Sequence, residues 1–113
     1  MTDSMNLLRG TLDALILKAL AGGALHGYGI VDWVREVTGG VLQIEDGALY
    51  TSLHRMEARG WLRSEWGVSD RGRRAKFYEL TAAGRRQLAA EARGWQRYAE
   101  AVGKVFATER GRP

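Results

Sequence analysis

Apolar side chains recur every three or four residues in the first third of the chain, the spacing of a helix with one buried face. Residues 7–21 and about 27–38 are therefore each predicted to be helical, and the glycine-rich GGALHGYG between them favours a turn. Gly39 and Gly40 are predicted to end the second helix as C-cap residues. The predicted core positions of the two helices are Leu8, Leu12, Leu15, Ile16 and Ala19, then Ile30, Val31, Val34 and Val37.

A third helix is predicted between Asp46 and Gly60. Asp46 is expected to cap the free amides of its first turn, and Gly60 to end it in a left-handed conformation. Leu49, Leu53 and Met56 share one face, which is predicted to be buried. The opposite face is polar, with small or flat residues that allow close approach by another molecule. It presents Gly47, Thr51, His54 and Ala58, flanked by Tyr50 and Arg55.

Two aromatic-rich, roughly alternating segments follow, at residues 61–67 and 75–80. They are predicted to form a β-hairpin, with the turn at residues 67–72. Three helices followed by a hairpin are the layout of a winged helix-turn-helix, in which the third helix reads the partner and the hairpin is the wing.

A last helix is predicted to run from a Thr81 cap to about Thr108, and its apolar residues follow a heptad seam. A helix of about 27 residues spans roughly 40 Å, whereas a compact domain of about 80 residues is about 30 Å across. The helix must therefore project. We expect a second copy of the chain to cover the stripe, the alternative being packing on its own domain. The seam residues, and thus the predicted dimer interface, are Leu88, Ala92, Trp95, Ala99, Val102 and Phe106.

The predicted fold class is thus mainly α with a small β-hairpin. Residues 1–80 are predicted to form a winged helix-turn-helix DNA-binding domain, and residues 81–113 a long C-terminal dimerisation helix and tail. The two subunits of a dimer would bind two half-sites about one helical turn of DNA apart, or a multiple of that distance.

Positive charge is concentrated in one window. The net charge is +4, and residues 55–76 carry seven cations against three anions, so the rest of the chain is close to neutral. Arginine outnumbers lysine fourteen to three, and its planar fork suits phosphates and base edges. A solvated loop is the alternative at the hairpin tip, but the preceding helix favours phosphate contacts. The predicted wing contacts are Arg71, Arg73, Arg74 and Lys76.

The third helix has features of a reading helix. Gly47 leaves the amides of the first turn uncovered, and such amides hold phosphate. Thr51 and His54 can exchange hydrogen bonds with base edges, and Tyr50 can bond to a backbone phosphate. Arg55, which flanks the same face, is also predicted to contact DNA. In the alternative, this face simply meets water, His54 is an ordinary surface residue and Tyr50 is partly buried.

Composition argues against other functions. The chain has no cysteine and only two histidines, so no disulfide, metal site or cofactor is expected. No Ser-His-Asp order or phosphate-cradling glycine loop supports an enzyme. The apolar stretch at residues 12–25 contains Asp13 and Lys18 and is too short and too charged to span a membrane. The N-terminal residues lack the layout of a signal peptide. We therefore expect no membrane partner and a cytoplasmic location.

Three ordered motifs resemble those of the PadR-like transcriptional regulators: HGYGI, EDGALYTSLHRMEARGWLRSEW and GRRAKFYELTAAGRRQL. The family pattern is a G-x-LY-x-x-L-x-R-L/M-E-x-x-G core, a basic wing and a Y-x-L-T-x-x-G-R start to the last helix. The resemblance covers about residues 7–90. It implies a winged-helix homodimer that represses transcription at a partly palindromic operator in double-stranded DNA.

The resemblance also implies which residues meet DNA. Tyr28 falls at the start of the second helix, which in the family crosses the DNA backbone. The sequence departs from the family at QIED, where Glu45 weakens the expectation of a phosphate contact at that position. The matched positions are Gly47, Tyr50, Thr51 and His54 on the reading helix, and Arg71, Arg73, Arg74 and Lys76 on the wing.

Trp95 has two interpretations. It lies on the seam between Ala92 and Ala99, which leave space beside its ring. Either the indole anchors the dimer core, or paired indoles line a slot for a flat aromatic effector. Some PadR-like regulators bind planar aromatic compounds between subunits, so the resemblance permits such a ligand without requiring it.

The predicted function is a homodimeric transcriptional repressor that binds double-stranded DNA and is released by a small effector. The alternative is a winged-helix module that binds protein or RNA, since the fold does not specify its partner.

Overall fold

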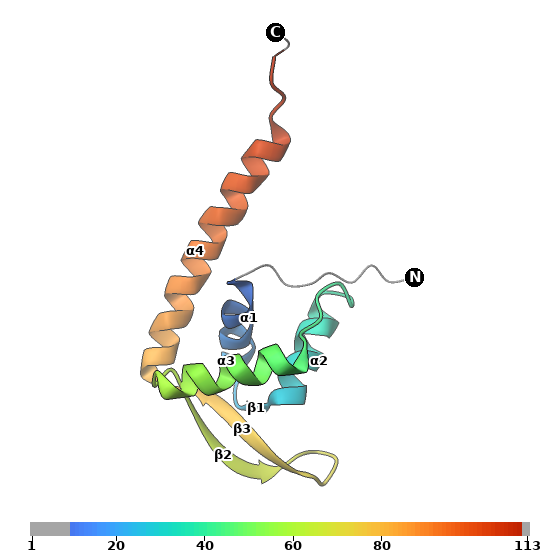
Figure 1. Ribbon diagram of the computed structural model, residues 1–113, viewed down its shortest axis with the longest axis vertical. Helices are drawn as coiled ribbons and strands as arrows, with labels where there is room; N and C mark the ends of the chain where they lie inside the picture. Colours follow the sequence, from blue (N-terminus) through green and yellow to red (C-terminus); the bar gives the residue numbers. More distant parts are fainter. Residues whose placement is uncertain (1–9, 112–113) are drawn as a thin grey trace.

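The computed structural model describes residues 10–111. Leu8, and with it the predicted beginning of the first helix at residues 7–9, lies outside them. The elements are α1 (Thr11–Leu20), β1 (Leu25–His26), α2 (Gly27–Val37), α3 (Asp46–Ala58), β2 (Leu62–Val68), β3 (Arg74–Leu80) and α4 (Ala82–Ala107). In Figure 1 the first three helices gather at one end of α4, the β2–β3 hairpin extends beyond them, and α4 projects the other way. The predicted winged-helix class with a long C-terminal helix is confirmed.

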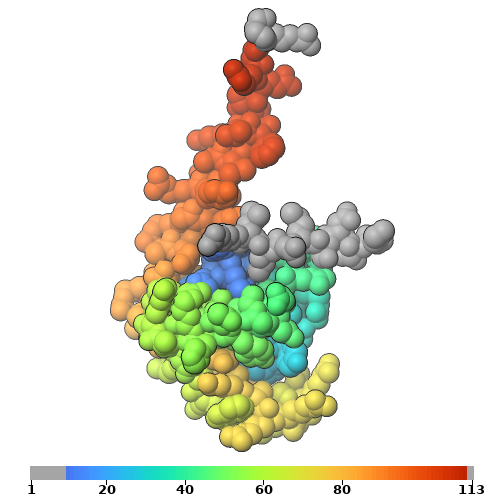
Figure 2. Space-filling model, viewed as in Figure 1, coloured from blue at the N-terminus to red at the C-terminus, as the bar shows by residue number. Residues whose placement is uncertain are grey.

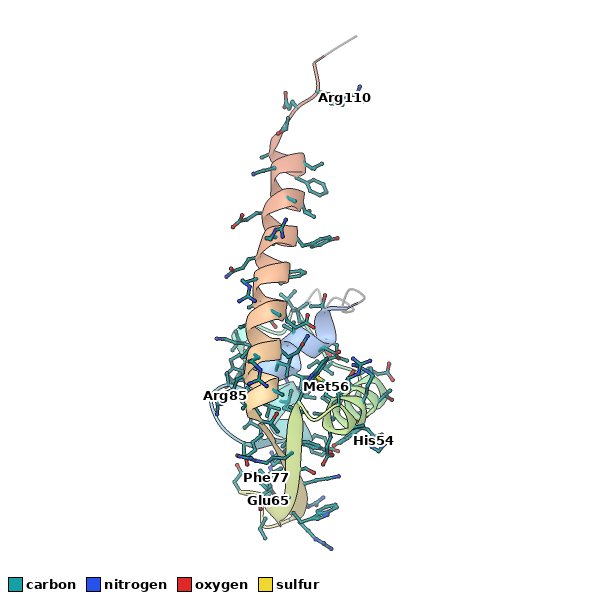
Figure 3. The ribbon with its side chains drawn as sticks, turned by 90° about the vertical axis from the view of Figure 1, so that its left-hand side faces the viewer. His54, Met56, Glu65, Phe77, Arg85 and Arg110 are labelled. Atoms are coloured by element: carbon teal, nitrogen blue, oxygen red, sulfur yellow. The ribbon has the colours of Figure 1, made fainter. Side chains whose placement is uncertain are left out.

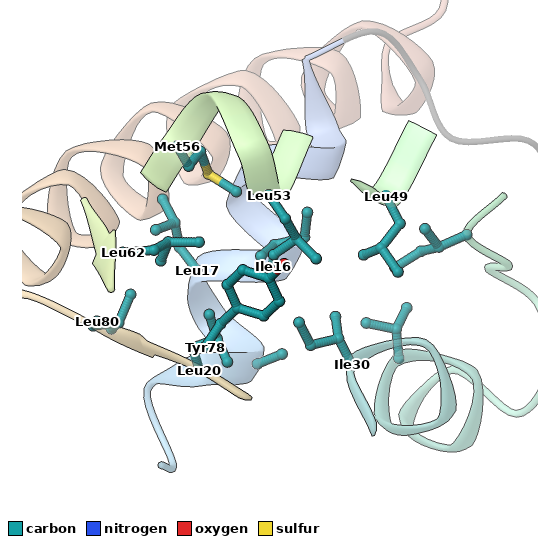
Figure 4. Packing of buried hydrophobic residues seen from close by; sticks show 13 residues of the cluster. Ile16, Leu17, Leu20, Ile30, Leu49, Leu53, Met56, Leu62, Tyr78 and Leu80 are labelled. Atoms are coloured by element: carbon teal, nitrogen blue, oxygen red, sulfur yellow. The ribbon is translucent and has the colours of Figure 1, made fainter. Parts of the chain in front are cut away.

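The core lies between the three short helices and the base of the sheet, as the close view in Figure 4 shows. Ile16 and Leu17 of α1 are completely buried, as are Ile30 of α2 and Leu53 of α3. Burying one such side chain contributes about 1.5–3 kcal/mol relative to leaving it exposed. The remaining core residues are Ala19, Leu20, Val34, Ile44, Leu49, Met56, Leu62, Tyr78 and Leu80.

The predicted apolar stripe of α2 is wrong at Val37, whose side chain is 63 % exposed. At about 100° per residue, Val37 shares the face of Ile30. Ile30 is buried, so the face is correct, but the neighbouring elements do not extend to the last turn of α2.

Helix ends follow local chemistry. Thr38 is the C-cap of α2, and Gly39 and Gly40 follow with φ of 60° and 84°, the left-handed conformation that glycine adopts without strain. The predicted glycine stop is therefore confirmed. At the other end of α2, the N–H of Gly29 donates to Nδ1 of His26 at 3.1 Å, a cap that the sequence reasoning missed.

The predicted cap of α3 is wrong by one residue. Glu45 occupies the N-cap position, because its carbonyl oxygen accepts the first helical hydrogen bond, from the N–H of Leu49 at 3.0 Å. Asp46 is the first helical residue, where its charge still suits the positive end of the helix dipole. Gly60 ends α3 as predicted, with φ of 79°, and the N–H of Trp61 donates to the carbonyl oxygen of Met56 at 3.0 Å.

The three strands form an antiparallel sheet in the order β1-β3-β2. The short β1 strand was not predicted. In the hairpin, Ser64 pairs with Tyr78 and Trp66 with Lys76. Because successive side chains alternate between faces, these four residues share the face that carries the buried Leu80, and Phe77 lies on the other face. Figure 3 shows Phe77 and Glu65 on the hairpin, below α4.

α4 begins where it was predicted to begin. The N–H of Gly84 donates to the Thr81 side-chain oxygen at 3.0 Å, and that hydroxyl donates to the carbonyl oxygen of Gly60 at 2.6 Å. α4 packs on α1 and β3. Gly84 is its only buried residue, and the helix extends beyond the other elements (Figure 2). The whole molecule, α4 included, measures 63 × 37 × 22 Å.

Candidate nucleic-acid interface

The outer face of α3 is exposed as predicted. Gly47, Thr51 and His54 are exposed and Tyr50 is 47 % exposed, whereas Leu53 and Met56 on the inner face are buried. Figure 3 shows His54 on the side of α3 turned away from the rest of the molecule. Base edges can therefore reach this row of side chains without any rearrangement of the core.

The first turn of α3 is less favourable to phosphate than its glycine suggests. A Cβ at Gly47 would lie 3.0 Å from Oε1 of Glu45, so that carboxylate reaches the first turn of the helix. Asp46 adds a second negative charge at the same end. A phosphate bound there would face both carboxylates, which is consistent with the departure from the family pattern at Glu45.

Tyr50 connects α3 to the start of α2. A Cβ at Gly27 would lie 2.6 Å from the Tyr50 hydroxyl oxygen, so only glycine at position 27 allows the ring to lie there. Burial, with a smaller contribution from Tyr28, raises the pKa of Tyr50 above the usual tyrosine value. Its hydroxyl is therefore protonated at neutral pH and available as a donor. Tyr28, the other predicted contact, is 65 % exposed at the start of α2.

Arg55 has a partner within the chain. Its Nη2 donates to Oδ1 of Asp13 on α1 at 2.7 Å, and this hydrogen bond raises the pKa of the guanidinium. Both side chains are partly exposed, so the pair is worth only about 0.2–1 kcal/mol. Asp13 holds the guanidinium over α1. A DNA contact by Arg55 remains a prediction, and such a contact would have to share the guanidinium with Asp13 or replace this bond.

The hairpin of β2 and β3, residues 62–80, is called the wing below. Arg71 and Arg73 are exposed at its tip, and neither forms an ion pair within residues 10–111. The guanidinium of Arg74 lies 4.5 Å from the centre of the Trp66 ring. Lys76, farther from the tip, has its Nζ 3.6 Å from Oε1 of Glu57. Three of the four predicted cations are thus free of acidic partners in the described part of the chain.

Glu57 holds the wing against α3, a role that the sequence reasoning missed. Its Oε2 accepts a hydrogen bond from the Ser64 hydroxyl at 2.6 Å, and its Oε1 faces Lys76. Ser64 and Lys76 come from different strands, so one carboxylate fixes both strands relative to the reading helix. The alternation of β2 and β3 could have placed Ser64 and Lys76 on one face, but it does not indicate which helix that face meets.

The predicted dimer seam is exposed along most of its length. Ala92 and Ala99 are exposed, Val102 is half-buried, and Trp95 and Phe106 are 44 % and 87 % exposed. Leu88 is different, because it packs against the chain's own core. That first position therefore contributes to the fold of the monomer.

A groove of about 450 Å³ lies between α1 and α4, beside the seam. Trp95 and Tyr98 line it from α4, with ring centres 5.8 Å apart and planes at 31°. Its α1 side consists of the small residues Gly10, Thr11 and Ala14. Gln87 and Glu91 also line the groove, so a flat aromatic ligand that carries a polar group suits it.

Within residues 10–111, no cluster of acidic and histidine side chains is suited to hold a metal ion. Over the same residues, every helix is too short or too polar to cross a membrane.

Comparisons with known proteins identify the family of the chain. The model of the family described as "Transcriptional regulator PadR-like family" matches residues 16–90. A transcriptional regulator from Mycobacterium tuberculosis, Rv3488, is 36 % identical over 87 residues, covering 77 % of this chain and 78 % of that protein.

Solved structures show the same fold. A PadR family transcription regulator from Clostridium difficile is 31 % identical, with a TM-score of 0.70, and the match covers 88 % of this chain and all of that one (100 %). A transcriptional regulator from Clostridium thermocellum is 27 % identical with a TM-score of 0.76, covering 85 % and 90 % of the two chains. All of these relatives are named as regulators of transcription. The chain belongs to the PadR-like family of transcriptional regulators.

Proposed function

We propose that this regulator is a sequence-specific repressor that binds double-stranded DNA as a homodimer. α3 would enter the major groove, and the wing would meet the flanking backbone or the adjacent minor groove, where arginine is favoured. The observation that carries the proposal is the joint surface of α3 and the wing. Polar residues cover the outer face of α3, exposed cations cover the wing, and Glu57 joins the two elements.

The contacts divide into two roles. Thr51 and His54 have side chains that can read base edges, whereas Arg71 and Arg73 offer charge without a fixed internal partner. We therefore assign sequence preference to α3 and most of the phosphate neutralisation to the wing. Tyr28 and Tyr50 are proposed to meet the backbone at the junction of α2 and α3.

The free face of α4 supports the dimer. An apolar stripe that includes the half-buried Val102 and the exposed Phe106 runs along the projecting half of the helix, where the described part of the chain covers little of it. In a dimer with its two-fold axis beside α4, each chain would cover the stripe of the other. The same symmetry would place two wings and two reading helices on one operator. A partly palindromic operator would match that symmetry.

The groove between α1 and α4 supports an effector site. Trp95 and Tyr98 offer aromatic faces beside the proposed interface, so a planar aromatic ligand could alter the spacing of the two subunits. Such a ligand would release repression by favouring a spacing that does not fit the operator.

The first test is selection of the purified protein on a randomised duplex library at low and physiological salt. We expect an inverted repeat that stays enriched at physiological salt. If about six phosphates are neutralised, log affinity should fall with a slope near −5 against log salt. Binding that enriches no sequence and vanishes as salt rises would refute sequence reading, and a protein or RNA partner would then be sought.

Variants separate the two roles. Arg73→Ala with Arg74→Ala should weaken binding to every duplex and reduce the salt slope by about 2. Thr51→Ala or His54→Ala should relax sequence preference and leave the slope unchanged. An arginine pair that altered the preferred sequence without changing the slope would reverse this assignment.

A further inference from the structure

Trp66 is a large aromatic side chain outside the core. It is 59 % exposed on β2, next to Val68 on the same face, which is 69 % exposed. That face is the one whose base contacts α3 through Ser64 and Glu57. A tryptophan in this position leaves much apolar surface in water, so burial in the core is not its main contribution.

The pairing of the two wing strands places Trp66 beside two cations. Trp66 lies directly opposite Lys76, and Arg74 is its diagonal neighbour on the same face. The guanidinium carbon of Arg74 lies 4.5 Å from the centre of the indole. A guanidinium held over an aromatic ring is attracted by the ring face and still has N–H donors for another partner.

Arg74 differs from the other wing arginines in this respect. Among the described residues it has no acidic partner, and Arg71 and Arg73 contact no aromatic ring. Flexible arginines lose side-chain entropy when they bind, whereas a stacked one has already lost part of it. Arg74 is therefore pre-oriented before any partner arrives.

We propose that Trp66 is a positioning residue that holds Arg74 in the conformation in which its guanidinium edge contacts DNA. This inference rests on the proposed function and deepens it. Trp66 adds no charge, so it acts through the geometry of Arg74. The wing would then contain one pre-oriented arginine for a phosphate contact of fixed geometry, and two free arginines for general attraction.

A double-mutant cycle on the duplex recovered by selection tests this role. Trp66→Leu should weaken binding about two- to fivefold, the usual range for a cation–π contact at an exposed site, with the salt slope unchanged. Arg74→Ala should reduce the slope by about 1. In the Arg74→Ala background, Trp66→Leu should have no further effect, whereas in the matched Arg73→Ala background it should keep its full effect. Equal losses in both backgrounds would overturn the proposal.

A measurement on the free protein keeps the two proposals separate. The indole ring current should shift the Arg74 side-chain protons upfield in NMR spectra, and the shift should vanish in Trp66→Leu and partly survive in Trp66→Phe. Unshifted protons in the parent protein would overturn the role of Trp66, even if duplex binding is normal. A parent with the shift that binds no duplex would instead refute the proposed function. Thermal unfolding of each variant identifies any that has lost its fold.

Discussion

At the scale of single residues, the closest constraint lies at the junction of α3, β2 and α4. A Cβ at Gly84 would lie 2.0 Å from the carbonyl oxygen of Trp61, a backbone atom that cannot rotate away. The same segment carries the Thr81 hydroxyl that caps α4 and binds Gly60. Glycine is thus required at position 84 for the close approach of two backbones, although its own conformation is helical.

Gly84→Ala is therefore expected to lower the free energy of unfolding by about 1–3 kcal/mol, the usual cost of overpacking. The matched control is Gly103→Ala on the same helix, where an added Cβ meets nothing within 4 Å. That change should stabilise α4 by up to about 1 kcal/mol. Chemical denaturation of both variants measures the difference, and a neutral Gly84→Ala would contradict the packing described.

Tyr78 is expected to contribute to a loss of stability at alkaline pH. Burial, with a smaller contribution from Glu57, raises the pKa of Tyr78 above the usual tyrosine value in the folded protein. The folded state thus favours the neutral phenol, so its contribution to stability is fully present below the unfolded pKa and is lost as pH rises through the folded pKa.

Tyr78→Phe removes the ionisable hydroxyl, so stability should fall less steeply above pH 10 than in the parent protein. The measurement is the midpoint of denaturation across the alkaline range. An unchanged slope in Tyr78→Phe would mean that another group causes the alkaline loss of stability.

At the scale of elements, the decisive feature is how the wing meets the reading helix. The hairpin and helix are each specified locally, but their relative position depends on Glu57 with Ser64 and Lys76. α3 and the wing must reach DNA at the same time, so looseness between them costs affinity even when each is intact.

Ser64→Ala breaks this link without changing charge. We expect a loss of about 1 kcal/mol in stability from the missing hydrogen bond, and several-fold weaker duplex binding with an unchanged salt slope. Ser69→Ala is the control, because the Ser69 hydroxyl bonds only within the wing tip, to the N–H of Arg73. Equal effects of the two changes on DNA binding would show that the link to α3 does not matter.

At the scale of the whole molecule, α4 sets the shape. A helix of 26 residues packs on α1 and β3 near its start and then leaves the domain. Its projecting part has little covered surface, and Phe106 is 87 % exposed there. A second chain is the partner proposed for this surface.

Val102→Glu with Phe106→Glu places two charges on the seam and should weaken self-association by more than about tenfold, since buried anchors of this kind contribute 2 kcal/mol or more. Ala101→Glu, which lies off the seam, is the control. Sedimentation velocity over a range of concentrations distinguishes dimer from monomer, and circular dichroism checks the fold. A parent protein that sediments as a monomer at all concentrations would refute the proposed dimer.

The sequence by itself determined the helices and the hairpin, with most of their ends to within a few residues, but not the short β1 strand. Gly40, Gly60 and Thr81 act through the backbone of their own neighbours, and the spacing of Leu49, Leu53 and Met56 shows which face of α3 is buried, because all of these effects are local. The predictions from sequence were wrong at the N-cap of α3, where two neighbouring acidic residues were both candidates, and at Val37, where burial depends on neighbouring elements.

The tertiary structure decided which distant side chains meet. Arg55 reaches Asp13, 42 positions away, and Leu88 of the seam turns to its own core. Glu57 joins two strands, and Arg74 stacks on Trp66 across the hairpin. The spacing of these residues along the chain does not predict the pairs, because each pair forms only after whole elements have packed against one another. The joint surface of α3 and the wing is therefore a property of the tertiary fold. The sequence indicated its residues individually but not how they lie relative to one another.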